Sequence, residues 1–204
     1  MNEANSNKYT ISTRDYVSKN KITGTLDSIR VQAILKRYLA IRRFCYGKVL
    51  DFACGCGYGA ELLSVSPEIE SILGVDRDQS AIEWAKKEFA NDKCNFISDD
   101  IKTIHDKFDT LVCVETIEHV NDVQIVKELI EQNNIDNLIV SFPDKKSSHY
   151  NTLHLHDFVL QDIVDMFPKH ILYYKFRLDD VQFVLLVKAP EKFPSFIYRN
   201  IHNL

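Results

Sequence analysis

The strongest constraint on the fold is a repeated alternation of short apolar runs with amphipathic patterns of helical period. The runs have the length and composition of buried strands. The expected strands are 48–52, 70–76, 94–98, 108–115, 135–143, 170–179 and 181–189, and the expected helices are 26–47, 60–65, 79–91, 120–132 and 155–167. Because strands and helices alternate, we expect right-handed crossovers within a mostly parallel sheet.

The last two expected strands depart from this alternation. They are 170–179 and 181–189, and they meet at Asp179 and Asp180, a connection too short for a parallel crossover. They should therefore pair as an antiparallel hairpin at one edge. The predicted fold class is α/β: a Rossmann-like, doubly wound, mostly parallel seven-stranded sheet with an antiparallel C-terminal edge hairpin.

Some helix details also follow from the pattern. Gly47 is expected to cap the C-terminus of helix 26–47, since glycine adopts the left-handed conformation common at that position. In helix 79–91 one apolar face is expected to point into the core, through Ala81, Ile82, Ala85 and Phe89.

A chain of 204 residues suits one globular domain. The expected divisions are an N-terminal helical cover or lid over 1–47, a main domain over 48–190 and a C-terminal tail over 191–204. Tyr9, Arg14 and Tyr16 are expected on a mobile lid near a bound ligand.

The charge and apolar patterns restrict the partners and the location. A net charge of −4 does not favour a nucleic acid or an anionic membrane surface. No apolar stretch approaches the roughly 20 residues that span a bilayer, and the first ten residues are too polar for a signal peptide. The five cysteines are expected to be free, buried thiols. We expect a cytoplasmic monomer or homodimer.

A glycine-rich loop follows the first expected strand. Gly55, Gly57 and Gly59 come shortly after Asp51, where a doubly wound sheet binds its ligands. Glycine allows the backbone to approach a ligand closely, and a helix that begins here directs free N–H groups toward it. The alternative is a metal or disulfide site at Cys54 and Cys56. A structural zinc site needs a second ligand pair, which the sequence lacks.

Two further acidic residues stand at the ends of the next strands. Asp76 ends the strand after the loop, where a carboxylate accepts hydrogen bonds from ribose hydroxyls. Asp100 follows the third strand and could meet an adenine amino group. The loop reads GxGxG and lacks the later glycine of GxGxxG, which argues against a dehydrogenase.

Four consecutive segments resemble the motifs of class I S-adenosylmethionine-dependent methyltransferases: VLDFACGCGYGAELL, ILGVDRDQSAIEWAKK, FISDDI and FDTLVCVETIEHV. They run in order across residues 48–120. The resemblance implies S-adenosyl-L-methionine as cofactor and S-adenosyl-L-homocysteine as product. The chain is most similar to small bacterial-type enzymes with ACGxGYG and ETIEHV motifs. These act on sugars, surface glycans or small metabolites, so the implied acceptor is an O or N atom of a small molecule or glycan.

The resemblance also implies which residues bind the cofactor. Asp51 would face the methionine amino group, Asp76 the ribose and Asp100 the adenine. The implied cofactor-binding residues are Asp51, Ala53, Gly55, Gly57, Asp76, Arg77, Asp100, Ile101 and Glu115. The family often has glycine where Ala53 stands, and Cys56 occupies a variable position.

Candidate catalytic residues are Glu115, His119 and His154. The ETIEHV segment lies where the fourth expected strand ends, beside the expected position of the cofactor methyl group. A base there could remove a proton from the acceptor. His119 could instead be structural, Glu115 could line the site, and His154 could be a loop residue. Asp157 could cap the helix that follows.

Two alternatives remain for the function. Small-RNA 2′-O-methyltransferases resemble this fold and bind a divalent metal through an ExxEH pattern, which Glu115, Glu118 and His119 match. His154 or His156 could supply a fourth ligand. The pattern also occurs in metal-free enzymes, and the chain has no basic RNA-binding extension, so our expectation is a site without metal. The other alternative is a non-catalytic cofactor-binding subunit.

Overall fold

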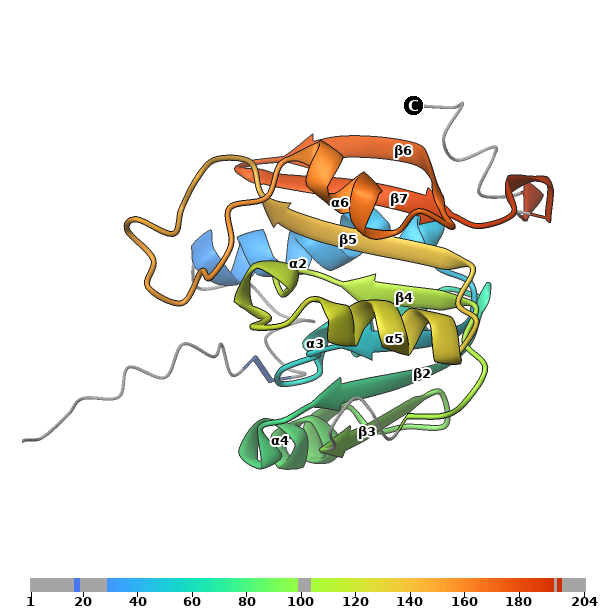
Figure 1. Ribbon diagram of the computed structural model, residues 1–204. Coiled ribbons are helices and arrows are strands. Elements are labelled where there is room, and N and C mark those ends of the chain that lie inside the picture. Colours follow the sequence, from blue (N-terminus) through green and yellow to red (C-terminus); the bar gives the residue numbers. More distant parts are fainter. Residues whose placement is uncertain (1–16, 19–28, 99–103, 193, 196–204) are drawn as a thin grey trace, which may run out of the picture.

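The computed structural model describes residues 17–18, 29–98, 104–192 and 194–195. A single seven-stranded sheet forms the centre of the molecule (Figure 1). The strands are β1 (Gly47–Phe52), β2 (Ile69–Asp76), β3 (Cys94–Ser98), β4 (Thr110–Cys113), β5 (Asn137–Pro143), β6 (Ile171–Leu178) and β7 (Val181–Val187). The α-helices are α2 (Ile29–Ile41), α3 (Tyr58–Ser64), α4 (Gln79–Phe89), α5 (Gln124–Gln132) and α6 (Leu160–Met166). Three short 3-10 helices are η1 (Arg42–Phe44), η3 (Ile117–His119) and η4 (Pro190–Lys192).

The strand order is β3-β2-β1-β4-β5-β7-β6. The first five strands in this order are parallel, and β7 pairs antiparallel with both β5 and β6. The predicted α/β class, the seven strands and the antiparallel C-terminal hairpin are therefore confirmed. The order reverses between β1 and β4, and this is where such sheets bind their ligands.

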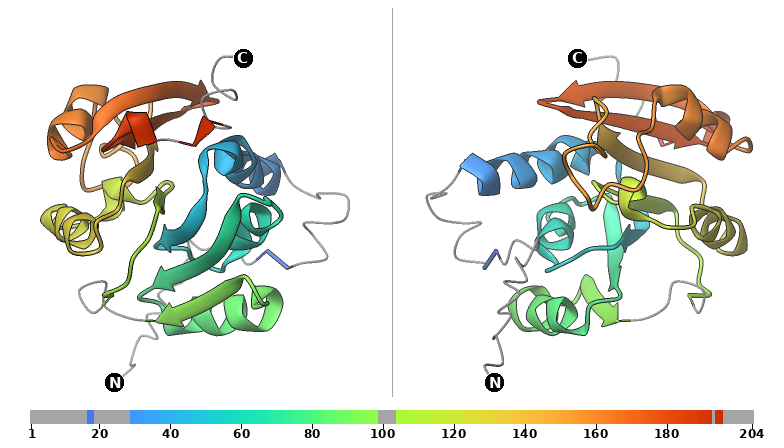
Figure 2. Two further views of the ribbon diagram at one scale, coloured as in Figure 1. Left: turned by 90° about the vertical axis from the view of Figure 1, so that its right-hand side faces the viewer. Right: turned by 60° about the vertical axis from the view of Figure 1, so that its left-hand side comes forward.

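The helices cover the sheet in two layers (Figure 2). On one face, buried residues of α2, α3 and α4 pack in one hydrophobic cluster, with Phe44 and Phe89 among the largest fully buried side chains. On the other face, α5 and α6 pack against a second cluster that includes Phe142. Within the described residues no helix combines the length and the apolar character that a membrane span requires.

Helix α4 forms as its pattern predicts. The four residues predicted for its core face, Ala81, Ile82, Ala85 and Phe89, are all fully buried. Asp78 caps its N-terminus by accepting hydrogen bonds from the backbone N–H groups of Ser80 and Ala81. The five cysteines are free and buried, as predicted.

Two local predictions are wrong. Gly47 has a positive φ of 63° but is not a helix cap, because the preceding helical segment ends at Phe44 and Gly47 begins β1. The helix expected over 155–167 begins at Leu160, and the residue before it is Val159. Asp157 is thus not its cap: it accepts hydrogen bonds from the backbone N–H groups of Ser147 and Ser148 and closes a loop.

Candidate functional site

A cavity of about 360 Å³ opens at the carboxyl ends of β1 and β4. Its size lies within the range of small-molecule sites. Four segments line it: helix α2, the loop after β1, the start of α3 and the segment after β4. The lining residues are Ala33, Ile34, Arg37, Tyr38, Ala53, Cys54, Gly55, Cys56, Tyr58, Val114, Glu115, Thr116 and His119.

The glycine loop is held in an unusual backbone conformation. Ala53, Gly55 and Gly57 have φ values of 55°, 55° and 82°, in the left-handed region. A Cβ atom at Gly57 would lie 2.7 Å from the Ala85 Cβ and 2.8 Å from the Phe96 Cε1, so a larger residue does not fit. The loop is therefore shaped by its glycines and packed directly on α4 and β3.

Asp76 joins this loop to β2. It is buried at the tip of the strand, and its Oδ2 accepts a hydrogen bond of 2.9 Å from the Gly55 N–H. Its Oδ1 accepts from the Asp78 N–H, also at 2.9 Å. Each carboxylate oxygen can accept more than one hydrogen bond, so ribose hydroxyls can bind to the same group.

Asp51 lies in the middle of the sheet and is fully buried. Its Oδ1 accepts a hydrogen bond of 3.2 Å from the Tyr38 hydroxyl, and its Oδ2 is buried without a hydrogen-bond partner. Burial raises the pKa of Asp51 to about 7, although the Tyr38 hydrogen bond acts in the opposite direction. A buried carboxylate with an unsatisfied oxygen favours a nearby cationic group.

Glu115 is strained and held by several partners. Its φ is 51°, a value that few residues other than glycine, asparagine and aspartate adopt. Its backbone N–H donates to the Ser141 Oγ at 2.8 Å, and that hydroxyl donates to the Glu115 Oε1 at 3.3 Å. The Oε2 lies 3.4 Å from a guanidinium nitrogen of Arg37. Burial raises the pKa of Glu115, while Arg37 opposes that shift.

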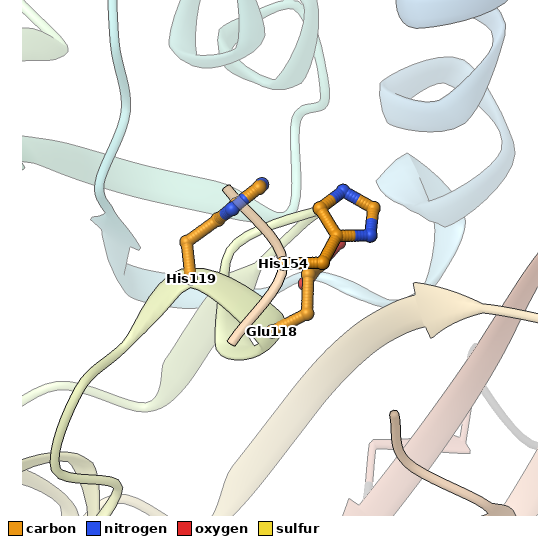
Figure 3. Close-up of side chains that lie close together, drawn as sticks. All are labelled: Glu118, His119 and His154. Carbon is orange, nitrogen blue, oxygen red and sulfur yellow. The ribbon is translucent and has the colours of Figure 1, made fainter. Parts of the chain in front are cut away.

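Glu118, His119 and His154 gather beside the cavity (Figure 3). Each offers one potential ligand atom, and these atoms lie within 4.8 Å of one another. Both carboxylate oxygens of Glu118 are buried without a hydrogen-bond partner, and burial raises its pKa to about 8. His119 Nδ1 is 2.7 Å from the Leu153 carbonyl oxygen, and His154 Nδ1 is 2.5 Å from the Ser147 Oγ.

The loop between β5 and α6 brings His154 into this cluster. Besides the contact of His119 with the Leu153 carbonyl oxygen, the Leu155 N–H donates to the Glu118 carbonyl oxygen at 2.8 Å, and His156 Nε2 lies 2.9 Å from the Val120 carbonyl oxygen. The loop is thus attached along η3, at the edge of the cavity. Burial and the neighbouring His119 lower the pKa of His154.

The residues predicted from the sequence lie at different distances from the cavity. Ala53, Gly55, Glu115 and His119 line it. Asp51, Gly57 and Asp76 are not among the lining residues, but Asp51 and Asp76 are hydrogen-bonded to residues that are, Tyr38 and Gly55. His154 lies beside His119, with ring centroids 4.8 Å apart. Arg77 is exposed at the end of β2. The predictions at Asp100 and Ile101, and those at Tyr9, Arg14 and Tyr16, lie outside the described residues.

The sequence reasoning missed the residues that α2 contributes. Arg37 and Tyr38 reach Glu115 and Asp51 respectively, and neither was predicted as a site residue. Ser141, which supports Glu115 from β5, was also missed. The one signal available was a charged residue, Arg37, on the same helical face as Ile34 and Ile41.

Comparisons with known proteins agree with this geometry. Residues 49–133 match the family described as methyltransferase domain. None of the curated proteins matches the sequence at a significant level. Among solved structures, magnesium protoporphyrin IX methyltransferase (ChlM) from Synechocystis PCC 6803 with bound SAM superposes with a TM-score of 0.57 and 16% identity, over 78% of this chain and 78% of that chain.

Two further structures are similar in fold. The N-methyltransferase NodS from Bradyrhizobium japonicum WM9 has a TM-score of 0.61 and 14% identity, over 79% of this chain and 97% of that one. The methyltransferase domain of the bacterial protein CtHen1 has a TM-score of 0.60 and 21% identity, over 77% of this chain and 98% of that chain. Residues 49–133 of this chain are therefore similar to the methyltransferase-domain family, and the chain shares its fold with these solved methyltransferases, in agreement with the fold that its motifs predict.

Proposed function

We propose that the protein is an S-adenosylmethionine-dependent methyltransferase that methylates an O or N atom of a small molecule or glycan. The observation that carries the proposal is the cavity at the reversal of strand order, with the glycine loop on one side and Asp51 and Asp76 hydrogen-bonded to residues that line it. Two buried carboxylates suit a ligand with ribose hydroxyls at one end and an ammonium group at the other.

The side chains after β4 suit removal of a proton from the acceptor. When bound, the cofactor supplies an activated methyl group on its sulfonium sulfur. Because the Leu153 carbonyl oxygen can only accept a hydrogen bond, His119 carries its proton on Nδ1 and leaves the Nε2 lone pair free in the neutral ring. We assign His119 Nε2 as the base that takes the proton of an acceptor hydroxyl or ammonium group. Glu115, fixed by Arg37 and Ser141, orients the acceptor across the cavity.

Cofactor binding is the first test. Isothermal titration calorimetry with S-adenosylmethionine, S-adenosylhomocysteine and NAD should show binding of the first two and none of the third. Asp76→Ala should weaken binding by about 1–3 kcal/mol, the scale of a lost buried hydrogen bond. Glu70→Ala, an exposed carboxylate on the same strand, is the matched control and should leave the affinity unchanged. Tighter binding of NAD would disprove the proposal.

Catalysis by His119 is tested separately. Formation of S-adenosylhomocysteine should be measured with a panel of sugar and amine acceptors. His119→Asn should lower kcat by about 10²–10⁴-fold, the range for a lost general base, with the cofactor affinity unchanged. His149→Asn, a histidine in the β5–α6 loop that contacts Tyr150, is the control. Equal activity of both variants would remove His119 from the mechanism.

A second candidate function is metal-dependent methylation of an RNA 2′-hydroxyl, favoured by the cluster of Glu118, His119 and His154. The donor set fits a divalent transition metal. Both histidine Nδ1 atoms have hydrogen-bond partners, which leaves both Nε2 atoms available, and such partners commonly orient metal-bound histidines. The Glu118 carboxylate, whose oxygens have no hydrogen-bond partner, would supply a negative charge to the metal ion. There the metal would act as a Lewis acid on the acceptor hydroxyl.

Glu115 does not join that cluster in the described structure, since its carboxylate contacts Arg37 and Ser141. The two functions are separated by titration with Mn²⁺ and by methylation of a short RNA with and without EDTA. Metal-dependent function predicts binding of Mn²⁺ that Glu118→Gln abolishes and Glu131→Gln, on the surface of α5, leaves intact. If Mn²⁺ does not bind and EDTA has no effect on turnover, this candidate is excluded.

A further inference from the structure

The environment of Asp51 is unusual for a carboxylate in the middle of a sheet. Asp51 pairs with Gly74 of β2 on one side and Val112 of β4 on the other, so its position is fixed by two parallel ladders. The side chain that donates to it comes from a third element, helix α2, through the Tyr38 hydroxyl. Tyr38 is itself only 5% exposed.

The fit of Tyr38 depends on a missing side chain. A Cβ atom on Gly59 would lie 2.2 Å from Cε1 and 2.3 Å from Cζ of the Tyr38 ring. Gly59 has no left-handed backbone that would require glycine, so the tyrosine ring is the reason that the position is small. The ring also makes an edge contact with Tyr58, at 5.7 Å between centroids. Tyr38 is thus seated in a slot over the first turn of α3.

Among the residues that the structure describes, the titratable groups that interact with Asp51 or with its partner Tyr38 leave a negative charge there without compensation. Those that interact with Asp51 come from α2, the segment before β1, β2, β3 and β4, and those that interact with Tyr38 come from the glycine loop and α3. They are Tyr38, Cys45, Cys54, Tyr58, Asp76, Cys94 and Cys113. These are phenols, thiols and one carboxylate, each neutral or negative near pH 7. A cationic ligand group would supply the missing charge.

We propose that Tyr38 is a positioning residue for the cofactor: its hydroxyl orients the Asp51 carboxylate toward the cationic methionine end, so that binding of this end is coupled to the seating of α2. The proposal rests on the proposed function, because it takes S-adenosylmethionine or its product as the ligand. Since coupling is reciprocal, bound cofactor also stabilises the position of α2.

The acid–base behaviour of Asp51 supports the geometry. With a pKa of about 7, Asp51 is about half protonated at neutral pH before the ligand binds. A nearby ammonium group favours the ionised form, so the remaining protons are released on binding. The Tyr38 hydrogen bond stabilises the same ionised form, and its removal should raise the pKa of Asp51 further.

The experiment compares Tyr38→Phe with the wild type. Calorimetry with S-adenosylhomocysteine, which keeps the ammonium group, is run from pH 6 to 8.5 in buffers of different ionisation enthalpy. Wild-type protein should release about half a proton at pH 7, and its affinity should fall as the pH falls below about 7. In Tyr38→Phe the midpoint of the pH dependence of affinity should move up by about one pH unit. The affinity of this variant should then be about tenfold weaker than that of the wild type at pH 6 and should converge with it at high pH.

The pH profile separates positioning from a structural effect. Loss of packing alone would weaken binding by the same factor at every pH, and that result would overturn the proposal. Tyr174→Phe, a tyrosine on β6 that packs on Phe44, is the matched control and should reproduce the wild-type profile. Gly59→Ala is the second variant. Its Cβ displaces the Tyr38 ring, and the upward shift in midpoint should recur.

The outcomes for the two proposals are distinct. If the wild type binds neither S-adenosylmethionine nor its product, the proposed function fails. If the wild type binds both, but Tyr38→Phe shows the same midpoint in the pH dependence of affinity and the same proton release as the wild type, the proposed function stands and the role of Tyr38 is refuted.

Discussion

At the scale of single residues, backbone strain is concentrated beside the cavity. Ala53 and Glu115 follow two neighbouring strands, β1 and β4, and both have positive φ values. The other two such residues that are not glycine, Asn134 and Asp179, are of types that tolerate this conformation. Strain of this kind persists only where surrounding structure enforces it, and it gathers at functional sites.

Relief of that strain should stabilise the protein. Ala53→Gly should raise the free energy of unfolding by up to about 1 kcal/mol, because glycine adopts a left-handed conformation without the steric cost that alanine carries. Urea denaturation measures the change. Asp179→Gly, in the turn between β6 and β7, is the comparison and should give a smaller gain. A lower stability of Ala53→Gly would show that its backbone is not strained.

The opposite substitution in the same loop should be harmful. Gly57→Ala should lower the free energy of unfolding by about 1–3 kcal/mol, because it combines a strained φ with a Cβ that overlaps Ala85 and Phe96. Denaturation gives the stability, and calorimetry should show loss of cofactor binding. An unchanged protein would mean that the loop shifts freely, contrary to its packing.

The raised pKa of Asp51 predicts how stability depends on pH. Between its ordinary pKa near 4 and its folded pKa of about 7, the folded state keeps a proton that the unfolded state has lost, so stability falls as the pH rises. Asp51→Asn removes the pH-dependent contribution of this carboxyl group to stability and keeps a hydrogen-bond acceptor for the Tyr38 hydroxyl. From pH 5 to pH 8 the variant should gain about 2–3 kcal/mol relative to wild type in urea denaturation. His154 and His170, whose pKa values are lowered, also affect the pH dependence of stability, but they are present in both proteins and do not affect the difference between them. Parallel curves of stability against pH would therefore contradict the raised pKa of Asp51.

At the scale of elements, the loop between β5 and α6 depends on one exposed carboxylate. Asp157 accepts hydrogen bonds from Ser147 and Ser148, and these lower its pKa to about 2. Asp157→Ala should release the loop. Limited proteolysis followed by mass spectrometry should then find faster cleavage within 145–159, with the melting temperature nearly unchanged. Asp122→Ala, which removes a similar contact before α5, is the control and should leave this loop as resistant as in the wild type.

The elements that sequence reasoning predicted well are those that local pattern determines. A buried strand such as β4 (Thr110–Cys113) coincides with the apolar run 111–114, and α4 shows its core face in its spacing. The start of α6 was wrong because a long-range contact decides it. The hydrogen bonds of Asp157 to residues ten and nine positions earlier keep the chain in a loop where the pattern favours a helix.

The same distinction applies to the candidate site. The glycine loop, Asp76 and Glu115 were predicted because they lie within motifs or at strand ends. Tyr38 was not, since its role depends on a partner thirteen residues away and on a slot at Gly59 in another helix. A single sequence carries no record of such pairings, whereas the packed structure shows them directly.

At the scale of the whole molecule, the cofactor should stabilise the folded protein. The cavity draws on α2, the loop after β1 and the segment after β4, so a ligand there is bound by residues that unfolding separates. At 100 times its Kd, such a ligand adds about 2.7 kcal/mol, which for a chain of this size raises Tm by about 5–10 °C. Differential scanning calorimetry with S-adenosylmethionine should show the shift, and NAD at equal concentration should not. A Tm unaffected by saturating ligand would place its binding outside this cavity.

The strand order has a consequence for synthesis of the protein. β7 lies between β5 and β6, although it comes last in sequence among the strands that the structure describes. Until Val187 has left the ribosome, β5 presents an unpaired apolar edge beside Phe142, and β6 has no neighbour in the sheet. The nascent chain therefore cannot complete its sheet before β7 is made, and until then the free edge of β5 is open to pairing with another chain.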